Sequence, residues 1–240
     1  MKQYRKKNPL SYALGAYPTM ELVLHAPELL QIIYTHPKID LPLLEKLRAH
    51  AKTLGIKMQE TSAMERLSGK GNIFVAASFV KQPRPLDADK PHLVLVNPSN
   101  VGNLGTILRS ALGWEYRDIA LIEPAADPFH PNCVRASMGS LFQQRIWLYK
   151  DFSSYQEMYP HHTLWSLMTR TEQRLEDIED FGDKHSFILG NESSGLPEEF
   201  ADITDPVTID TSDAIDSLNI TLAAAIAMHQ AYSKKRPIRG

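Results

Sequence analysis

The sequence predicts an α/β protein with a mostly parallel sheet covered by helices on both faces, preceded by a small N-terminal α/β domain. The first observation is the apolar run HLVLV at 92–96, which is typical of a parallel strand buried on both faces. The second is the alternation of strand-like and helical segments from this run to the end of the chain. The third is a proline-containing segment that separates the two parts.

Each element of the second part follows from its hydrophobic pattern. Short apolar runs bounded by turn residues predict strands, and apolar residues at helical spacing predict helices. Beyond 92–96, strands are expected at 119–122, 164–168, 187–189 and 207–209, and helices at 105–114, 133–142 and 218–233.

The first part also mixes helices and strands. Its pattern predicts helices at 20–30 and 41–54 and strands at 31–34 and 72–77. The segment KQPRPLDADK at 81–90 has two prolines and no apolar periodicity, which is typical of a linker. We therefore expect two domains, at 1–82 and 90–240.

Composition narrows the class of protein. Apolar residues make up 43% and charged residues 22% of the 240 residues, as in an ordinary globular protein, and no apolar run approaches the ~20 residues that span a bilayer. The basic start lacks the apolar stretch of a signal peptide. With a single cysteine, Cys133, no disulfide can form within the chain, so we expect a cytoplasmic protein without membrane contact.

Charge alone gives a weak indication of the partner. The net charge of −2 is unlike the strongly basic balance of many nucleic-acid binders. Lysines and arginines nevertheless cluster at both ends of the chain, where they can contact phosphates locally or simply be solvated.

The first segment with chemical potential is NPSNVGNLGTILRSA, at 97–111, between a strand and a helix. Ligands bind at the carboxyl ends of parallel strands, so this loop is well placed. Asn103 can donate and accept hydrogen bonds. Arg109 lies in an apolar helical stretch, and its guanidinium suits a phosphate or carboxylate, although an ordinary solvent-facing arginine is equally compatible.

Two further segments follow later strands. FILGNESSGLPEEF, at 187–200, places Glu192 at a strand end between two glycines, a frequent position for an active-site carboxylate but also compatible with a plain loop. VTIDTSDAIDSLNITLAAAIAMHQ, at 207–230, leads from a strand to Ser217, Leu218 and Asn219 and then into a helix of small residues. Ser217 is a natural N-cap of this helix.

Together these segments resemble the three signature motifs of the TrmH (SpoU) branch of the SPOUT RNA methyltransferases. Asn103, Gly105 and Arg109 match the first motif, and Ser217, Leu218 and Asn219 match the third. The second motif is matched by Gly190, Glu192, Gly195 and Leu196. The resemblance covers about 92–235, and the first 80 residues are similar to the ribosomal-protein-like substrate-binding domain of some members.

The resemblance implies a fold, a cofactor and an activity. It implies a trefoil knot within 164–235, a homodimer, and an enzyme that transfers a methyl group from S-adenosyl-L-methionine to a ribose 2′-hydroxyl of tRNA or rRNA. It also implies that five residues bind the cofactor: Met168, Gly190, Asn191, Ile209 and Leu218. One departure concerns the third motif, where Asp210-Thr211 and Asp213 replace the family's usual Pro-Met and glycine.

The resemblance also assigns catalytic residues. A guanidinium stays protonated, so we expect Arg109 to hold the RNA phosphate and stabilise the developing alkoxide instead of acting as a base. Glu192, Ser217 or the phosphate would take the proton, while Asn103 and Asn219 orient Arg109 and the ribose.

Two other functions remain open at this stage. A Rossmann-type nucleotide-binding enzyme would use Gly102, Gly105 and Glu123, although the glycine spacing differs from a dinucleotide motif. A non-catalytic RNA-binding protein on the same fold is the second alternative. No metal site is expected from His130, His161 and His162, whose spacing fits none. Of the three tryptophans that could stack bases, Trp114 and Trp165 are expected to pack in the core, and Trp147 is left open.

Overall fold

The computed structural model describes residues 3–62 and 73–235, which form two compact units. Of these residues, the first unit contains 3–62, 73–82 and 127–143, and the second contains 83–126 and 144–235. The sequence predicted that 127–143 would belong to the second domain. It belongs to the first because Phe142 packs edge-on against Phe79 at 5.0 Å and the hydroxyl of Ser11 donates to the carbonyl of Phe129.

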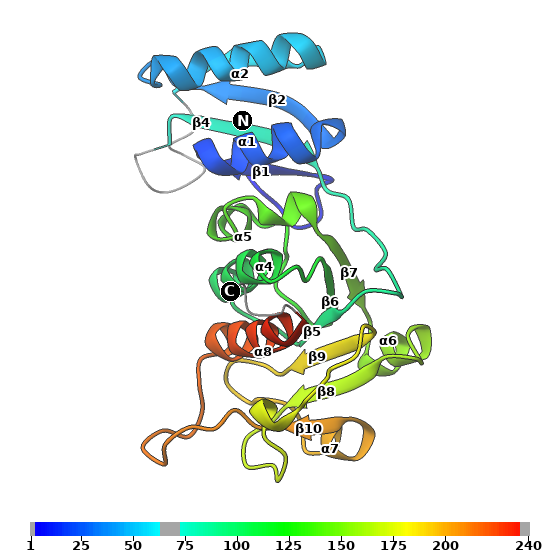
Figure 1. Ribbon diagram of the computed structural model, residues 1–240. Coiled ribbons are helices and arrows are strands. Elements are labelled where there is room, and N and C mark those ends of the chain that lie inside the picture. Colours follow the sequence, from blue (N-terminus) through cyan, green and yellow to red (C-terminus); the bar gives the residue numbers. More distant parts are fainter. Residues whose placement is uncertain (1–2, 63–72, 236–240) are drawn as a thin grey trace. The chain divides into compact units, whose positions relative to one another are not determined.

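The first unit is built on a four-stranded sheet in the order β1-β4-β2-β3 (Figure 1). The strand β4 (Val75–Val80) runs antiparallel to β1 (Leu10–Leu14) and β2 (Leu30–Thr35), whereas β3 (Lys57–Glu60) is parallel to β2. Among the described residues, three helices accompany the sheet: α1 (Ala16–His25), α2 (Leu41–Leu54) and α5 (Pro131–Ala136).

Local signals explain which of the predicted elements are found. The helix predicted at 41–54 is confirmed, because Asp40 caps it by accepting from the amide of Leu43 and Gly55 ends it in a left-handed conformation. The helix predicted at 20–30 is wrong in its bounds: α1 ends at His25 and a 3-10 turn, Pro27–Leu29, leads into β2. The sequence reading also missed β1 and β3, and part of the strand predicted at 72–77 falls on residue 72, outside the described residues.

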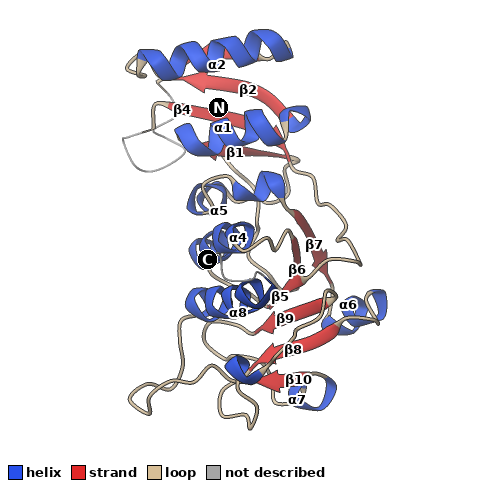
Figure 2. Cartoon of the chain, in the orientation of Figure 1, coloured by secondary structure: helices blue, strands red, loops and turns tan. Residues whose placement is uncertain are grey.

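The second unit is built on a parallel six-stranded sheet in the order β10-β8-β9-β5-β6-β7 (Figure 2). Its strands are β5 (His92–Val96), β6 (Asp118–Ile122), β7 (Arg145–Tyr149), β8 (Thr163–Leu167), β9 (His185–Leu189) and β10 (Asp205–Val207). All five pairings are parallel, which confirms the predicted mostly parallel sheet. If β5 is counted as the first strand of this unit, its neighbour on the side away from β6 is the fifth strand, β9. In a dinucleotide-binding sheet, the neighbour of the first strand at that position is the fourth strand.

Helices cover both faces of this sheet, as the sequence predicted. The helices α4 (Val101–Gly113) and α8 (Ile220–Lys235) lie on one face, and α6 (Phe152–Met158) and α7 (Phe200–Ile203) lie on the other (Figure 1). Buried leucines of α4 and buried alanines of α8 bring these two helices together. The small residues allow the close approach.

Some elements after residue 90 differ from the sequence prediction. The helix predicted at 133–142 is two pieces, α5 (Pro131–Ala136) and the 3-10 turn Ser140–Gln143, because Met138 and Gly139 have positive φ angles. The strand β7 and the helix α6 were not expected. Among the described residues, no helix is both long and apolar enough to cross a bilayer, and no cluster of metal-ligating side chains occurs.

Two central strands of the second unit each begin with a buried histidine. The ring of His92 on β5 bonds the hydroxyl of Tyr155 at 2.8 Å, and the ring of His185 on β9 bonds the hydroxyl of Tyr116 at 2.5 Å. Burial lowers the pKa of His92 and of His185 to about 4, because a charged imidazole loses its hydration there. The folded protein therefore holds both rings neutral near pH 7.

We expect acid to destabilise the second unit between pH 6.5 and pH 4. Both rings have a lower pKa when folded than the value of about 6.5 in an unfolded chain, so their contribution is complete above that pH and is lost as the pH falls. At pH 5 each ring should cost about 2 kcal/mol of unfolding free energy. Urea denaturation at pH 7.5 and pH 5 measures this loss of unfolding free energy. The loss should be smaller in the double variant His92→Gln, His185→Gln. It should be unchanged in the control variant His161→Gln, because His161 is exposed. An unchanged loss in the double variant would contradict the assignment.

Candidate functional site

The loops that carry the three sequence motifs begin at one edge of the second sheet. Because the strands are parallel, their carboxyl ends meet at the same edge. The first motif follows β5, the second follows β9, and the third follows β10. With β10, β8, β9 and β5 adjacent in this order, the three segments start from neighbouring positions.

The carboxylate of Glu192 joins the second motif to the first. It accepts hydrogen bonds from the amide and the hydroxyl of Ser99, at 3.1 Å and 2.8 Å, and from the amide of Asn100 at 3.1 Å. The side-chain amide of Asn103 donates to the same carboxylate at 3.5 Å. Glu192 therefore clamps the residues that open α4 to the loop after β9.

The hydrogen bonds keep Glu192 ionised. Partial burial by itself would raise the pKa of this carboxyl, but the bonds from Ser99 and Asn100 outweigh it, so the pKa lies below the ordinary value. The start of α4 also favours an anion, since its first amides carry partial positive charge. A carboxylate with a lowered pKa that already accepts four donors is a poor general base. Its chemistry is that of a positioning residue.

The helix α4 begins earlier than the sequence predicted. The expected start was residue 105, whereas the helix starts at Val101 because Asn100 caps it, accepting from the amides of Gly102 and Asn103. Asn103 consequently lies in the first turn of the helix instead of in the loop before it.

A second connection runs between the loops after β5 and β9. The side-chain amide of Asn191 donates to the backbone carbonyl of Asn97 at 2.7 Å, and the side-chain amide of Asn97 donates to the backbone carbonyl of Glu123 at 2.8 Å. Asn97 adopts a positive φ of 52°, a conformation that asparagine tolerates better than most residues. Asn191, expected to bind cofactor, thus has a structural bond as well.

The turn after β9 requires glycine at its first position. Asn191 and Gly195 pair through two backbone hydrogen bonds, of 3.1 Å and 2.9 Å, which folds the turn back on Gly190. A Cβ atom at Gly190 would lie 2.0 Å from the carbonyl carbon of Gly195 and 2.2 Å from the amide nitrogen of Leu196. Only a residue without a side chain fits.

Arg109 and Thr106, which lies one turn earlier, are both exposed on α4, and Asn103, six residues before Arg109, is half-buried. Its side chain is exposed and makes no hydrogen bond or ion pair with the residues that the structure describes. Arg109 is about 9 Å along the helix axis from Asn103, given the helical rise per residue. The guanidinium is therefore presented to solvent on the helix that Glu192 anchors, without a protein partner within the described part.

The third motif supplies the cap of α8. Asn219 accepts from the amide and the hydroxyl of Thr221, at 2.8 Å and 2.7 Å, so Asn219 takes the cap position that the sequence assigned to Ser217. Ser217 is exposed. Among the described residues, no hydrogen bond joins Ser217 or Asn219 to Glu192 or Arg109.

The residues expected to bind a cofactor lie at the same sheet edge. Met168 directly follows β8, and its amide donates to the carbonyl of Val207 at 3.0 Å. Ile209 follows β10 by two residues and is half-buried, as is Leu218. Within the described residues, the backbone amides and carbonyls of Ile209 and Leu218 make no hydrogen bonds. They are available to a ligand.

The acidic residues that depart from the family pattern are exposed. Asp210 forms an ion pair of 2.7 Å with Arg174, next to the backbone bond from the amide of Leu175 to the carbonyl of Thr208. Asp213 is exposed as well. The pairing of Asp210 thus holds the loop after β10 to the segment that follows β8.

Ser99, Asn100 and Asn97 are site residues that the sequence reading did not single out. A signal was present for two of them, because an asparagine just before an apolar helix predicts an N-cap and an asparagine after a strand tolerates a positive φ. No sequence signal pairs Ser99 with Glu192, 93 positions away.

Comparison with known proteins decides the family. The sequence model of the SpoU rRNA methylase family matches residues 90–229. The chain belongs to the SpoU rRNA methylase family. This membership, together with the strand order, leaves the dinucleotide-enzyme alternative without support.

Relatives of this SpoU-family chain are RNA methyltransferases by name. An uncharacterized tRNA/rRNA methyltransferase of Synechocystis is 31% identical over 145 residues, covering 58% of this chain and 52% of the relative. The 23S rRNA (uridine(2479)-2′-O)-methyltransferase of Streptomyces viridochromogenes is 27% identical over 158 residues, covering 63% of this chain and 55% of the relative. The matches thus span about half the length of these curated relatives.

Solved structures share the fold over nearly the whole chain. The SpoU methyltransferase AviRb from Streptomyces viridochromogenes superposes with a TM-score of 0.81 at 21% identity, covering 95% of this chain and 90% of that one. The AdoMet-bound rRNA methyltransferase from Sinorhizobium meliloti superposes with a TM-score of 0.79 at 23% identity, covering 95% and 89%. At these identities, the likeness establishes the fold.

Proposed function

We propose that this SpoU-family chain is an RNA methyltransferase that transfers a methyl group from S-adenosyl-L-methionine to a ribose 2′-hydroxyl of tRNA or rRNA. The observation that carries the proposal is the family match over 90–229, within which Glu192 clamps the first motif to the second. The 2′-O specificity is supported by the Streptomyces relative, whose name states that position.

The residues at the carboxyl edge of the sheet fit the cofactor. The backbone amides and carbonyls of Ile209 and Leu218, which make no hydrogen bond with a described residue, would provide the donors and acceptors that an adenine edge needs. Gly190, Asn191 and Met168 would complete the site around them. When bound, S-adenosyl-L-methionine supplies a methyl group made electrophilic by its sulfonium.

The side chains of α4 would handle the RNA. Arg109, exposed and without a protein partner in the described part, would hold a phosphate through its planar fork and stabilise negative charge developing on the 2′-oxygen. Asn103, held by Glu192, would orient the ribose together with Asn219. Because Glu192 is ionised and fully occupied, the proton of the 2′-hydroxyl would leave to the phosphate or through Ser217.

Assembly and location extend the proposal. A homodimer is supported by Leu222 and Ile226, which lie one turn apart on α8 and are 55% and 40% exposed. Covering such an apolar surface with a second subunit is favourable.

The first unit would contribute to binding the RNA, and the chain after β8 would form the knot of the family. We propose that the protein works in the cytoplasm, with Cys133 as a buried free thiol.

Mass mapping of 2′-O-methyl nucleotides in total RNA, with and without the gene, tests the activity. One ribose should lose its methyl group in the deletion strain and regain it when the purified protein is added with S-adenosyl-L-methionine. Calorimetry with S-adenosylhomocysteine should show binding to the full chain. If the cofactor product does not bind and no ribose changes, the non-catalytic RNA-binding alternative takes the place of this proposal.

A further inference from the structure

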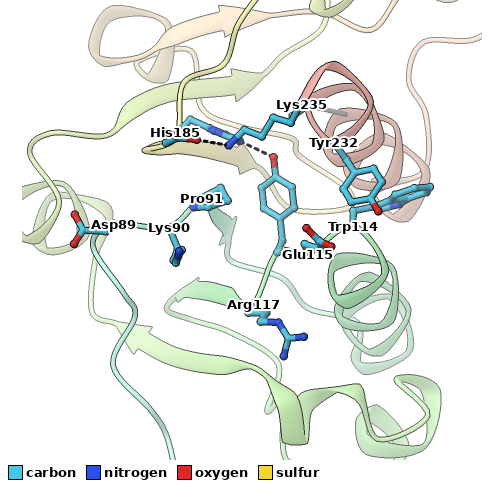
Figure 3. A pocket seen from close by; sticks show the side chains of 12 residues that line it. Asp89, Lys90, Pro91, Trp114, Glu115, Arg117, His185, Tyr232 and Lys235 are labelled. Carbon is cyan, nitrogen blue, oxygen red and sulfur yellow. Dashed lines mark hydrogen bonds and ion pairs between the residues drawn. The ribbon is translucent and has the colours of Figure 1, made fainter. Parts of the chain in front are cut away.

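A cavity of about 520 Å³ lies at the opposite edge of the second sheet from the motif loops (Figure 3). It is lined by Lys90 and Pro91 just before β5, by residues 114–117 between α4 and β6, by Asp183 and His185 at the start of β9, and by the end of α8. Since these segments adjoin the amino ends of the strands, the cavity is separate from the carboxyl edge that carries Glu192. Its volume lies within the range of about 300–1,000 Å³ that small-molecule sites occupy.

Two aromatic rings form one wall of the cavity. Trp114 ends α4 and meets Tyr232 of α8, with ring centroids 5.4 Å apart and planes inclined by 62°. A second contact of Trp114, with His229 at 4.8 Å, steadies its ring from the same helix. Figure 3 shows Trp114 and Tyr232 beside one another at the ends of the two helices. A ring that is fixed at its edges and only partly buried is suited to stack a flat ligand.

Cationic side chains accompany the aromatic wall. Lys90, Arg117 and Lys235 all line the cavity. Lys235 is paired with Asp183 at 3.0 Å, and Asp89 is paired with Lys184 at 2.5 Å, so two of the three acidic residues of the lining already have cationic partners. The ammonium group of Lys90 is exposed and makes no hydrogen bond or ion pair with a described residue. The cavity thus combines a stacking surface with a cation available to an anion.

We propose that this cavity binds a nucleotide, with the base against Trp114 and Tyr232 and the phosphate at Lys90. Aromatic stacking combined with a backbone-tracking cation is how proteins hold unpaired bases without reading their sequence. Among the surfaces of this chain that the structure describes, this one joins both features in one concavity. The nucleotide belongs either to a single-stranded stretch of RNA or to the free nucleotide pool. Only binding of RNA in this cavity rests on the proposed function. In that case the cavity would contact the RNA substrate at a second place, away from the reacting ribose.

Titration of the full chain with uridine 5′-monophosphate, adenosine 5′-monophosphate and a short single-stranded oligoribonucleotide tests the site. Saturating S-adenosylhomocysteine is included so that a nucleotide cannot be measured in the cofactor site. We expect binding of all three, weakened roughly five- to hundred-fold by Trp114→Leu, the range found when a stacking ring is removed. Trp114→Tyr should recover part of the affinity. Tighter binding of the oligoribonucleotide than of the monophosphates identifies RNA as the source, and equal binding identifies a free nucleotide.

Lys90→Glu is a second test of the nucleotide site that should fold even if Trp114→Leu does not, because Lys90 is exposed. It should weaken nucleotide binding by roughly ten-fold, whereas Lys150→Glu, the same charge change at an exposed site outside the lining, should not. No nucleotide binding by the unmodified chain, or equal binding by the Lys90 and Lys150 variants, overturns the site. Methyl transfer is scored separately, so loss of the proposed activity with nucleotide binding intact would refute only the proposed function.

Discussion

Replacing Arg109 by lysine is expected to lower kcat/KM for RNA methylation by roughly 100-fold or more, as loss of a charge-stabilising donor does in other enzymes. Lysine keeps the positive charge but lacks the planar fork that grips a phosphate through two parallel hydrogen bonds. Arg109 is exposed on α4 without a partner among the described residues, so the change leaves no buried group unsatisfied. Single-turnover methylation with saturating RNA separates the chemical step from binding.

Two measurements separate this effect from damage to the helix. Ser110→Ala, at the next position of α4, removes only a hydroxyl that bonds the carbonyl of Thr106, and it should leave turnover within about two-fold. Binding of S-adenosylhomocysteine to the Arg109→Lys variant should be unchanged, because the cofactor residues lie on other segments. Near-normal turnover in Arg109→Lys would show that a point charge suffices, and the proposed role of the fork would be wrong.

Gly190→Ala is expected to destabilise the chain by about 3 kcal/mol or more and to abolish cofactor binding. The added Cβ atom would lie 2.0 Å from the carbonyl carbon of Gly195, and the atoms it meets are backbone atoms that cannot rotate away. The turn itself is closed by the backbone pair between Asn191 and Gly195, so it would have to open. Glu192, which directly follows Asn191 in that turn, would then lose its bonds to the start of α4.

Other glycines provide graded controls for this prediction. Gly113, at the end of α4, has open space around it and no positive φ, so Gly113→Ala should be neutral or slightly stabilising. Gly195 has open space but a φ of +68°, so Gly195→Ala should cost about 1 kcal/mol from backbone strain alone. Urea denaturation followed by circular dichroism ranks the three variants. A Gly190→Ala variant as stable as Gly113→Ala would show that the close approach is absent in solution.

The sequence was informative where a local signal specified the structure. The run at 92–96 became a buried strand with the predicted bounds, and the helix predicted at 41–54 also has those bounds, which Asp40 and Gly55 set. The predicted bounds were wrong at 20–30, where the apolar pattern continues past a proline. Pro27 disfavours helical geometry at Ala26 and opens the 3-10 turn that follows α1, and Leu30 then enters β2, which pairs with β4.

The candidate site shows the same division. The residue types and their order identified Asn103, Arg109 and Glu192, since the three motifs are matched in one chain. Their arrangement had to come from the structure: Glu192 anchors the start of α4 through Ser99 and Asn100, and Asn219 takes the cap position expected of Ser217. The roles of Arg109, Ser217 and Asn219 toward RNA stay predictions.

By itself, the sequence determined the fold class and the family resemblance, and it supplied the residues proposed to perform the chemistry, because periodicity and residue type are local properties. Only the tertiary structure decided that 127–143 packs with the first unit, that β9 lies between β5 and β8, and that Glu192 is saturated with donors. These features depend on contacts between residues far apart in the chain, and their free energy comes from burial and hydrogen bonds that form only once the strands have paired.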